Sequence, residues 1–392
     1  MWDDLRDYKI LEGDCIEMMR SLPSDSIDAI VTDPPYGLGF MDKDWDASVP
    51  GVDWARECLR VLKPGGHLVA FGGTRTVHRL TCAIEDGGFE IRDLFNWIYF
   101  SGFPKNLDIS KQFDREAGLL GSEGGNWRAE GDRMVLSAPT DPRVYVPPEP
   151  QSELAKRYRG YGTALKPAIE PATLARKPLE KGLSVARNVA KWGTGAINID
   201  ACRFGYGDPC WVGPQSTNLN GGSYNTKGTS KKSKDRATSY YTEVAEKEFI
   251  NPKGRFPANL YQCAKPSRGE REAGLDHLKM RPARSNMCLG DGQGERFDGR
   301  ESPEVANFHP TVKPIKLMRW LCRLIGGKKG SVILDTFCGS GTTGCAAILE
   351  GFDFVGIEIT SDYLPIIKGR LEWSKEEYMR ENAQLSLFED AI

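Results

Sequence analysis

Residues 331–359, SVILDTFCGSGTTGCAAILEGFDFVGIEI, decide the fold. They predict a strand, a glycine-rich turn, a helix and a second strand. Gly339, Gly341 and Gly344 match the pattern G-x-G-x-x-G, and Glu358 ends the second strand near the spacing expected of an acid that binds ribose hydroxyls. Because the first turn of a helix exposes free amide protons, we expect a nucleoside cofactor at this turn.

Two alternative roles for this turn stay open. A nicotinamide dinucleotide binds to the same kind of strand–turn–helix unit, which would make the protein an oxidoreductase. A glycine-rich turn can also serve only the close packing of a helix on a strand. The turn therefore predicts a ligand site without choosing the ligand.

The rest of the chain predicts the sheet to which this unit belongs. Segments 26–33, 67–73 and 89–100 have the composition of buried strands, and 52–62 has a helical spacing that the following KPGG should end. Residues 315–325 predict an amphipathic helix, and 361–383 a longer one. Strands that alternate with helices predict an α/β fold with a mostly parallel, doubly wound sheet in three layers.

The charge of the chain is distributed unevenly. The formal net charge of the 392 residues is −2, but residues 151–300 hold 26 Lys and Arg against 15 Asp and Glu, a net of +11. The remaining residues then carry −13. A basic block between acidic flanks is typical of an insert that binds a polyanion, although an ordinary solvated surface can have the same composition.

Length and apolar pattern bear on localisation. The chain is long enough for two domains, or for one domain with a large insertion. It has no apolar run of eighteen residues, a polar N-terminus without a secretory signal, and ten cysteines without a tight framework. We therefore expect a cytoplasmic protein with reduced thiols.

No metal site is expected, because the histidines are dispersed and the spacing is irregular among Cys202, Cys210, Cys263 and Cys288.

A second polar corner follows the strand predicted at 26–33. Residues 29–37, AIVTDPPYG, begin as an apolar run and end in a carboxylate, two prolines and a tyrosine. In an open parallel sheet, ligands lie beyond the carboxyl ends of the strands. Asp33 and the glycine turn should therefore line one cleft, although they stand far apart in the chain.

These residue types suit the activation of an exocyclic amine on a nucleobase. The lone pair of such an amine is delocalised into the ring, so two fixed acceptors on its N–H bonds would pull it towards a tetrahedral, nucleophilic geometry. The Asp33 carboxylate and the Pro34 carbonyl, held by a rigid backbone, would be these acceptors. Tyr36 offers a flat face for a base swung out of the double helix.

Together the two corners resemble the amino-group DNA methyltransferases that use S-adenosylmethionine. The order of the motifs, with DPPY first, an insert next and FCGSGTT last, is similar to the β-group arrangement of that family. The stretches LKPGGHLVAF (62–71) and HPTVKP (309–314) resemble two further sequence motifs of the family. The resemblance covers about residues 8–115 and 300–375, and parts of the insert are similar to phage and prophage members. It implies double-stranded DNA as the partner, in the cytoplasm and nucleoid of a prokaryotic cell, and a place in restriction–modification.

The resemblance also implies a domain plan. Residues 1–115 would be the catalytic half and 301–380 the cofactor-binding half of a class I, Rossmann-like methyltransferase. Residues 116–300 would be the target-recognition insert, and 381–392 a C-terminal tail. Members of the β group often dimerise, so a homodimer is a further expectation.

The resemblance assigns a role to each site residue. The target base would be held by Asp33, Pro34, Pro35 and Tyr36. Asp14 would accept from the cofactor's adenine amine, Glu358 would bind the ribose, and Asp335 would lie beneath the turn. The methionine end would be held by His309, Thr311 and Lys313. The remaining cofactor-binding positions are Cys15, Phe337, Cys338, Gly339, Ser340, Gly341 and Thr342.

Alternatives remain open for the target base and for the activity. In this family, enzymes with DPPY mostly methylate adenine N6 and enzymes with SPPY mostly methylate cytosine N4. Asp33 therefore favours adenine without excluding cytosine. An oxidoreductase would leave DPPY without a role. A DNA-binding protein with a dead methyltransferase core is the other rival, against which the intact Asp33, Tyr36 and Glu358 argue.

Three further segments have candidate roles. Trp45 could cover the target base or belong to the core. The lysines of 225–238 and the arginines of KGRFPAN (253–259) and RPARSN (281–286) are candidates for phosphate contacts, which position a protein without reading the sequence. QLSLF resembles the peptide with which bacterial proteins bind the polymerase sliding clamp, although an apolar tail packed on its own domain is the alternative. The clamp would be contacted by Gln384, Leu385, Leu387 and Phe388.

Overall fold

The structure, a computed structural model, describes residues 8–38, 48–102, 106–119, 149–205, 208, 210, 253–282 and 304–389, with 384–389 described by their backbone alone. These residues belong to two units. The larger unit draws on residues 1–99 and 169–392, and the smaller on residues 100–168. Trp45, Cys288 and the lysines of 225–238 lie outside the described residues.

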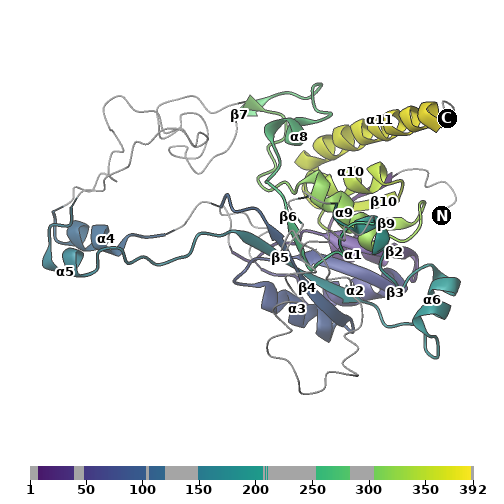
Figure 1. The fold of residues 1–392 in the computed structure, drawn as a ribbon, viewed down its shortest axis with the longest axis horizontal. Coiled ribbons are helices and arrows are strands. Elements are labelled where there is room, and N and C mark those ends of the chain that lie inside the picture. The colour runs from purple at the N-terminus through teal and green to yellow at the C-terminus, as the bar shows by residue number, and fades with distance from the viewer. Residues whose placement is uncertain are drawn as a thin grey trace, which may run out of the picture. The chain divides into compact units, whose positions relative to one another are not determined.

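An eight-stranded sheet forms the centre of the larger unit (Figure 1). Its strand order is β1-β10-β9-β2-β3-β5-β4-β6. Every neighbouring pair is parallel except those that β5 makes with β3 and β4. The predicted, mostly parallel sheet is therefore confirmed. Its strands are β1 (Tyr8–Glu12), β2 (Ile27–Thr32), β3 (Leu62–Phe71), β4 (Glu90–Ile98), β5 (Ile169–Arg176), β6 (Leu260–Gln262), β9 (Val332–Asp335) and β10 (Asp353–Glu358).

Helices cover both faces of this sheet. One face carries α1 (Cys15–Arg20), α2 (Val52–Val61) and α3 (Val77–Asp86). The other carries α9 (Ile315–Ile325), α10 (Thr342–Leu349) and α11 (Leu364–Glu389). The shorter elements of this unit are α6 (Val185–Trp192), η3 (Asp200–Cys202), α8 (Arg268–Glu272), β7 (Arg281–Pro282), β8 (Glu304–Val305) and η4 (Ser361–Tyr363).

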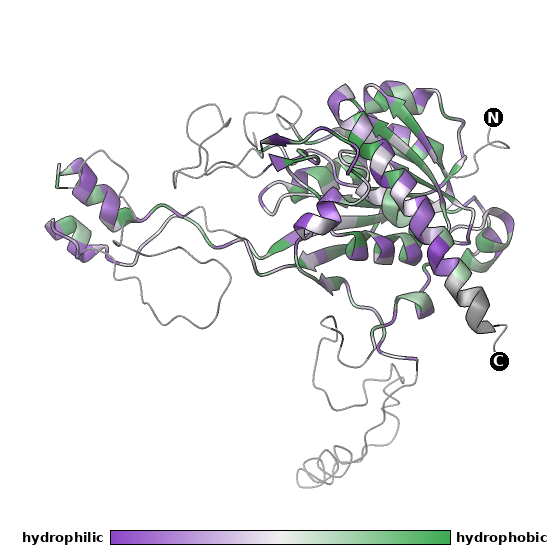
Figure 2. Cartoon of the chain, turned by 90° about the horizontal axis from the view of Figure 1, so that it is seen from above, coloured by the Kyte–Doolittle hydropathy of each residue, from purple (hydrophilic) through white to green (hydrophobic). Residues whose placement is uncertain are grey.

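The alternation of side chains along each strand produces the three layers. In β3, Val69 and Phe71 pack into the core beneath α9, α10 and α11, whereas Leu68 and Ala70 pack into the core beneath α1, α2 and α3. A strand buried on both faces needs apolar residues at successive positions, which is the pattern of the central strands here. Figure 2 shows hydrophobic residues concentrated in the strands and hydrophilic ones along α11.

Two parallel strand pairs join the beginning of the chain to its end. β1 pairs with β10, and β2 pairs with β9. The buried Asp28 carboxylate strengthens the second pairing, since it accepts from the Val332 amide at 2.8 Å and from the Lys63 ammonium at 2.6 Å. The turns that follow β2 and β9 therefore leave the sheet at the same edge.

The strand after α2 begins earlier than predicted. Residues 63–66, KPGG, were expected to separate the helix from a strand at 67, but β3 starts at Leu62, directly after the helix. The pairing with β2 jumps from Ile27–Leu62 to Ala29–His67, so KPGG forms a bulge between two paired stretches. Gly65 permits it, because its φ of +80° is one that residues with a side chain rarely adopt.

The interval 116–300, expected as one insert, contributes to both units. Its strands β5 and β6 belong to the main sheet, where β5 is hydrogen-bonded on both sides. Residues 100–168 form the smaller unit, which contains α4 (Ile109–Glu116) and α5 (Glu153–Arg157). Antiparallel pairing within a mostly parallel sheet gives no distinct signal in composition, so β5 was not predicted as a strand and its residues were assigned to the insert.

Aromatic rings in tilted and edge-on contact and one buried carboxylate hold the smaller unit together. The Phe113 and Tyr158 rings lie 5.6 Å apart, and the Tyr158 and Tyr161 rings 5.5 Å apart. The Asp114 carboxylate accepts from the amides of Gln151 at 3.0 Å and Ser152 at 2.8 Å. These two hydrogen bonds lower the pKa of Asp114.

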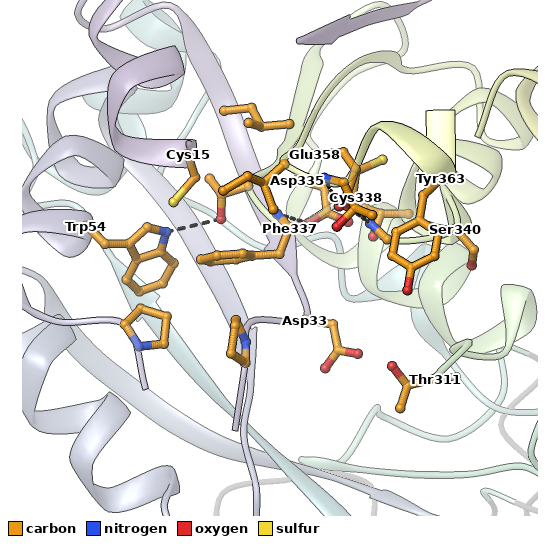
Figure 3. A pocket seen from close by; sticks show the side chains of 18 of the residues that line it. Cys15, Asp33, Trp54, Thr311, Asp335, Phe337, Cys338, Ser340, Glu358 and Tyr363 are labelled. Carbon is orange, nitrogen blue, oxygen red and sulfur yellow. Dashed lines mark hydrogen bonds between the residues drawn. The ribbon is translucent and has the colours of Figure 1, made fainter. Parts of the chain in front are cut away.

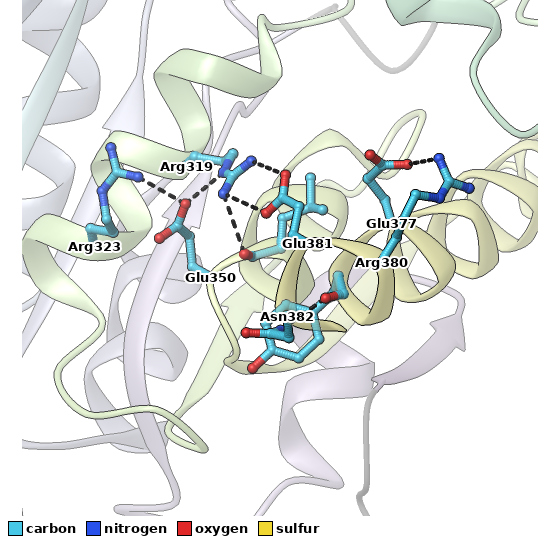
Figure 4. Close-up of polar contacts among 9 residues, drawn as sticks. Arg319, Arg323, Glu350, Glu377, Arg380, Glu381 and Asn382 are labelled. Carbon is cyan, nitrogen blue, oxygen red and sulfur yellow. Dashed lines mark hydrogen bonds and ion pairs between the residues drawn. The ribbon is translucent and has the colours of Figure 1, made fainter. Parts of the chain in front are cut away.

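A network of ion pairs joins α11, through Glu381, to α9 and to the end of α10 (Figure 4). Glu350, after the end of α10, accepts from Arg319 at 2.5 Å and from Arg323 at 2.9 Å, both on α9. Arg319 also pairs with Glu381 on α11 at 3.3 Å. The helix continues to Glu389, so the backbone of residues 384–388 is helical where a tail was expected. Within the described part of the chain, no helix combines the length and apolarity needed to cross a membrane.

We predict that Glu350→Gln lowers the free energy of unfolding by about 1–3 kcal/mol, because two half-buried guanidinium groups lose their shared carboxylate. Glu377→Gln is the matched control, since it breaks a more exposed pair with Arg380 and should cost at most about 1 kcal/mol. Urea unfolding of both variants measures the difference. Equal losses would contradict a structural role for the Glu350 network.

Candidate functional site

A cavity of about 390 Å³ opens at the edge of the sheet where β2, β9 and β10 end (Figure 3). Residues from both ends of the chain form its walls, as the two polar corners predicted. The lining residues are Gly13, Asp14, Cys15, Ile16, Asp33, Pro35, Ser48, Val49, Pro50, Gly51, Trp54, His309, Thr311, Lys313, Met318, Asp335, Thr336, Phe337, Cys338, Gly339, Ser340, Thr342, Thr343, Ile357, Glu358, Ile359, Thr360 and Tyr363.

Backbone geometry explains the glycines of the turn after β9. Gly339 has a φ of +56°, and Gly341, the N-cap residue before α10, has a φ of +77°. A Cβ on Gly339 would lie 2.9 Å from Nε2 of His309. Gly339 is therefore needed both for the left-handed backbone and for the close approach of the histidine ring.

His309 is neutral and has a defined tautomer. Its Nδ1 lies 2.7 Å from the Thr311 carbonyl oxygen, which can only accept, so Nδ1 carries the proton and Nε2 is an acceptor facing the turn. Burial lowers the pKa of His309 to about 3. The ring also packs edge-on against Tyr363, at 4.7 Å between centroids.

Asp335 is the buried carboxylate beneath the turn. Its Oδ1 accepts from the Thr32 hydroxyl at 2.7 Å and from the Phe337 amide at 3.1 Å, so it connects the ends of β2 and β9. Burial raises the pKa of Asp335 to about 6, against the lowering effect of these hydrogen bonds. The group can therefore change its charge near neutral pH.

Glu358 and Asp14 face the cavity with part of their hydrogen-bonding capacity used by the backbone. Glu358 accepts from the Gly339 amide at 2.7 Å and the Thr360 amide at 2.9 Å, which fixes the carboxylate against the turn. Burial raises the pKa of Glu358. Asp14 caps α1, with Oδ1 accepting from the amides of Ile16 and Glu17.

Aromatic rings form two sides of the cavity. The Trp54 and Phe337 rings lie 6.0 Å apart, and the Trp54 indole donates to the Thr336 hydroxyl at 3.1 Å. Figure 3 shows these two rings on one side of the view and Tyr363 on the other. Trp54 and Tyr363 were not predicted from the sequence, because an aromatic residue in a helical segment is usually interpreted as part of the hydrophobic core. Trp54 is indeed buried in the core beneath α1, α2 and α3.

The second polar corner is a ring of four side chains. The Tyr36 hydroxyl lies 2.9 Å from Asp33 Oδ1 and 3.1 Å from Glu170 Oε2. The Lys313 ammonium contacts Asp33 Oδ2 and lies 3.2 Å from both the Tyr36 hydroxyl and Glu170 Oε2. Residues from the turn after β2, from β5 and from the segment before α9 therefore meet at this corner.

Burial and neighbouring charges determine the ionisation of the ring. Burial raises the pKa of Asp33, although the Lys313 ammonium opposes the rise. The pKa of Tyr36 is well above its usual value because of burial and the adjacent carboxylates. Burial disfavours the charged form of Lys313, but Asp33 and Glu170 outweigh it and raise the pKa of Lys313. Lys313 is thus a cation.

Of the predicted cofactor positions, all line the cavity except Gly341, which stands at the start of α10. Asp33 and Pro35 also line it, while Pro34 is buried. Lys313 lies at the DPPY corner as well as at the cavity, whereas the sequence suggested a place at a cofactor's methionine end. Glu170 was missed, because no motif surrounds it and only the sheet topology brings it to Asp33.

Of the arginines proposed for phosphate contacts, Arg255 exchanges backbone hydrogen bonds with Phe204, and Arg284 lies outside the described residues. Two basic residues nearby were not singled out in the sequence: Lys253 pairs with Asp200 at 3.1 Å, and the Arg203 guanidinium lies 5.5 Å from the centroid of the exposed Phe256 ring. Arg281 stacks on the Phe308 ring at 4.4 Å. Cys202 and Cys210 are buried. Among the residues that the structure describes, no three His, Cys, Asp or Glu side chains gather in a way that could hold a metal ion.

The chain is similar to DNA methylases in sequence. A family model described as DNA methylase, of the N6/N4 type, matches residues 27–369. The type II methyltransferase M.HindIII of Haemophilus influenzae is 21% identical over 406 aligned residues, which cover 92% of this chain and 94% of that protein. M.HpaI of Haemophilus parainfluenzae is 30% identical over 119 residues, or 28% of this chain and 37% of the length of M.HpaI.

Solved structures give weaker matches. The crystal structure of the M1.HpyAVI–SAM complex is 17% identical and has a TM-score of 0.41, with 93% of this chain and 98% of that chain covered. The cytosine-N4-specific PvuII DNA methyltransferase is 16% identical and has a TM-score of 0.45, with 95% and 92% covered. Scores this low assign no function to the chain.

Proposed function

This chain belongs to the DNA methylase family that its residues 27–369 match, and we propose that it methylates adenine N6 within a specific sequence of double-stranded DNA. The methyl donor is S-adenosylmethionine. Cytosine N4 is the alternative target, since the family model spans both kinds of enzyme. One observation carries the proposal: the Asp33 corner and the glycine turn open into the same cavity.

The cavity fits S-adenosylmethionine in the chemistry of its walls. Two aromatic rings, Trp54 and Phe337, suit a flat purine, and Glu358 suits ribose hydroxyls. Asp14 and Cys15 would lie along the adenine. His309 and Thr311 would hold the methionine end, where the unprotonated Nε2 of His309 can accept from an ammonium group. Asp335 and the turn would support both parts.

The family's cofactor supplies an electrophilic methyl group on a sulfonium and leaves as a neutral sulfide. The residues of this chain would prepare the nucleophile. Asp33 accepts one amine hydrogen and the Pro34 carbonyl the other, which localises the lone pair on nitrogen. The new C–N bond forms as the C–S bond breaks, and the positive charge passes from sulfur to nitrogen. The methylated nitrogen would then release one proton to solvent, so no strong general base is needed for the transfer itself.

We place DNA recognition within residues 116–300, where the chain is basic. The smaller unit, which takes in residues 116–168, and the segment around Phe256 and Arg203 are the described parts that would contribute. Binding should weaken steeply with salt, because phosphate contacts release counterions. The proposed setting is the prokaryotic cytoplasm, in association with the nucleoid and within restriction–modification. A phage origin and a homodimer are further parts of the proposal.

Replacing Asp33 tests the proposed reaction directly. We expect Asp33→Ala to lower the single-turnover rate of methyl transfer by at least about 10²-fold, because the amine loses its charged acceptor. Mass spectrometry of nucleosides from the methylated DNA should detect N6-methyladenine with the unchanged protein. Detection of N4-methylcytosine would establish the alternative base. Methylation by Asp33→Ala at the rate of the unchanged protein would contradict the assigned role.

The pKa of Asp335 predicts how cofactor binding depends on pH. Because a nearby cation favours the ionised carboxylate, the affinity for cationic S-adenosylmethionine should rise as pH increases through about 6. S-adenosylhomocysteine has a neutral sulfur and should show a smaller rise. Calorimetry between pH 5 and 8 measures both, and Asp335→Asn should make the two profiles parallel. Parallel profiles before the substitution would contradict the prediction.

The proposed sliding-clamp contact is tested by deletion. The backbone of residues 384–388 is helical, so binding an extended groove would require the last turns of α11 to unwind. Deleting 384–392 should abolish binding to a bacterial clamp in a pull-down or surface plasmon resonance measurement. Methyl transfer on short DNA should be unchanged. Undiminished clamp affinity after the deletion would reject the idea.

A further inference from the structure

Glu170 is the second carboxylate of the ring of side chains that surrounds Asp33. It comes from β5, within the middle of the chain, and Oε2 lies 3.1 Å from the Tyr36 hydroxyl and 3.2 Å from the Lys313 ammonium. Tyr36 and Lys313 each also contact Asp33, on its two different oxygens. Glu170 is thus joined to Asp33 through two separate side chains.

The ring is largely buried, which strengthens the electrostatic interactions between its charged groups. The side chain of Lys313 is 7% exposed, that of Glu170 19% and that of Asp33 20%. Lys313 lies 5.0 Å from the centroid of the Phe71 ring and 5.5 Å from that of Tyr36. With little water to screen them, charges at hydrogen-bond distance interact far more strongly than on a surface.

A charge count shows what Glu170 changes. The ring contains two carboxylates and one ammonium, so it carries −1 when all three are ionised. Lys313 divides its hydrogen bonds between Asp33 and Glu170. Without the Glu170 charge, the ring would be neutral, and Lys313 would be left with Asp33 as its single carboxylate partner here.

That difference matters for the proposed reaction. The target amine gains positive charge as the methyl group arrives, and it needs the negative charge of Asp33 at that moment. A lysine paired only with Asp33 competes with the amine for this carboxylate. A lysine shared with a second carboxylate fixes the orientation of Asp33 without cancelling its charge.

We propose that Glu170 is a positioning residue that shares Lys313 and Tyr36 with Asp33, so that the catalytic carboxylate keeps a net negative charge for the target amine. The inference rests on the proposed role of Asp33 and applies to adenine N6 and cytosine N4 alike. It predicts an effect on the methyl-transfer step and little effect on cofactor binding, because Glu170 is outside the set of residues that line the cavity.

The first test replaces the charge while preserving the shape. Glu170→Gln should lower the single-turnover rate of methyl transfer on the order of a hundredfold, with the dissociation constant of S-adenosylmethionine changed by less than about threefold. Glu90→Gln is the matched control, since Glu90 pairs at 2.6 Å with Arg176, which lies on the same strand as Glu170. It should leave the rate unchanged. Glu170→Asp, which keeps the charge, should lose no more than about tenfold.

The second test restores the charge by another route. Glu170→Gln combined with Lys313→Met removes one negative and one positive charge, so the ring returns to −1. The double variant should methylate about tenfold faster than Glu170→Gln alone. A merely structural role would instead make the double variant slower than either single one.

The outcomes separate this inference from the proposed function. If the unchanged protein methylates DNA and Glu170→Gln is equally fast, or if the double variant is slower than Glu170→Gln, the inference is wrong while the proposed function stands. If the unchanged protein transfers no methyl group to any DNA, the proposed function itself fails. If Glu170→Gln loses cofactor binding while Glu170→Asp keeps it, Glu170 acts on the cofactor site and the inference is also wrong.

Discussion

The parallel pairing of β2 with β9 is the constraint on which the site depends. It joins the first part of the chain to the last, with Asp28 bonded to the Val332 amide at one end and Thr32 bonded to Asp335 at the other. Both carboxylates are buried, so neither hydrogen bond is replaced by water without cost. Because the two strands end at the same edge, DPPY and the glycine turn open into one cavity.

The charges gathered at this edge fit the proposed chemistry. Asp33, Glu358 and Asp335 all line the cavity, and burial raises the pKa of each. Such a site favours cations, and the proposed reaction begins with a cationic cofactor and moves its charge onto the target nitrogen. Lys313 is the cation of the DPPY corner, and Glu170 shares it with Asp33.

The sequence predicted the parts of the site that local patterns encode. Strand and helix periods indicated the sheet, and the positive φ of Gly339 explains why the turn could be identified from its glycines. Glu170 could not be found in this way, because the antiparallel placement of β5 brings it to Asp33. The sequence indicates that Trp54 is a core residue, and in the structure it belongs both to the hydrophobic core and to the wall of the cavity. Lys313 was recognised by its motif, but its partner depends on tertiary packing.

The distance between two atoms in a complex tests the central claim most directly. A crystal structure with bound S-adenosylmethionine would give the separation of the Asp33 carboxylate and the cofactor's methyl carbon. One amino nitrogen must fit between them, about 3 Å from each, so the account predicts a separation of about 6 Å. A methyl carbon directed away from Asp33, at more than about 10 Å, would contradict it.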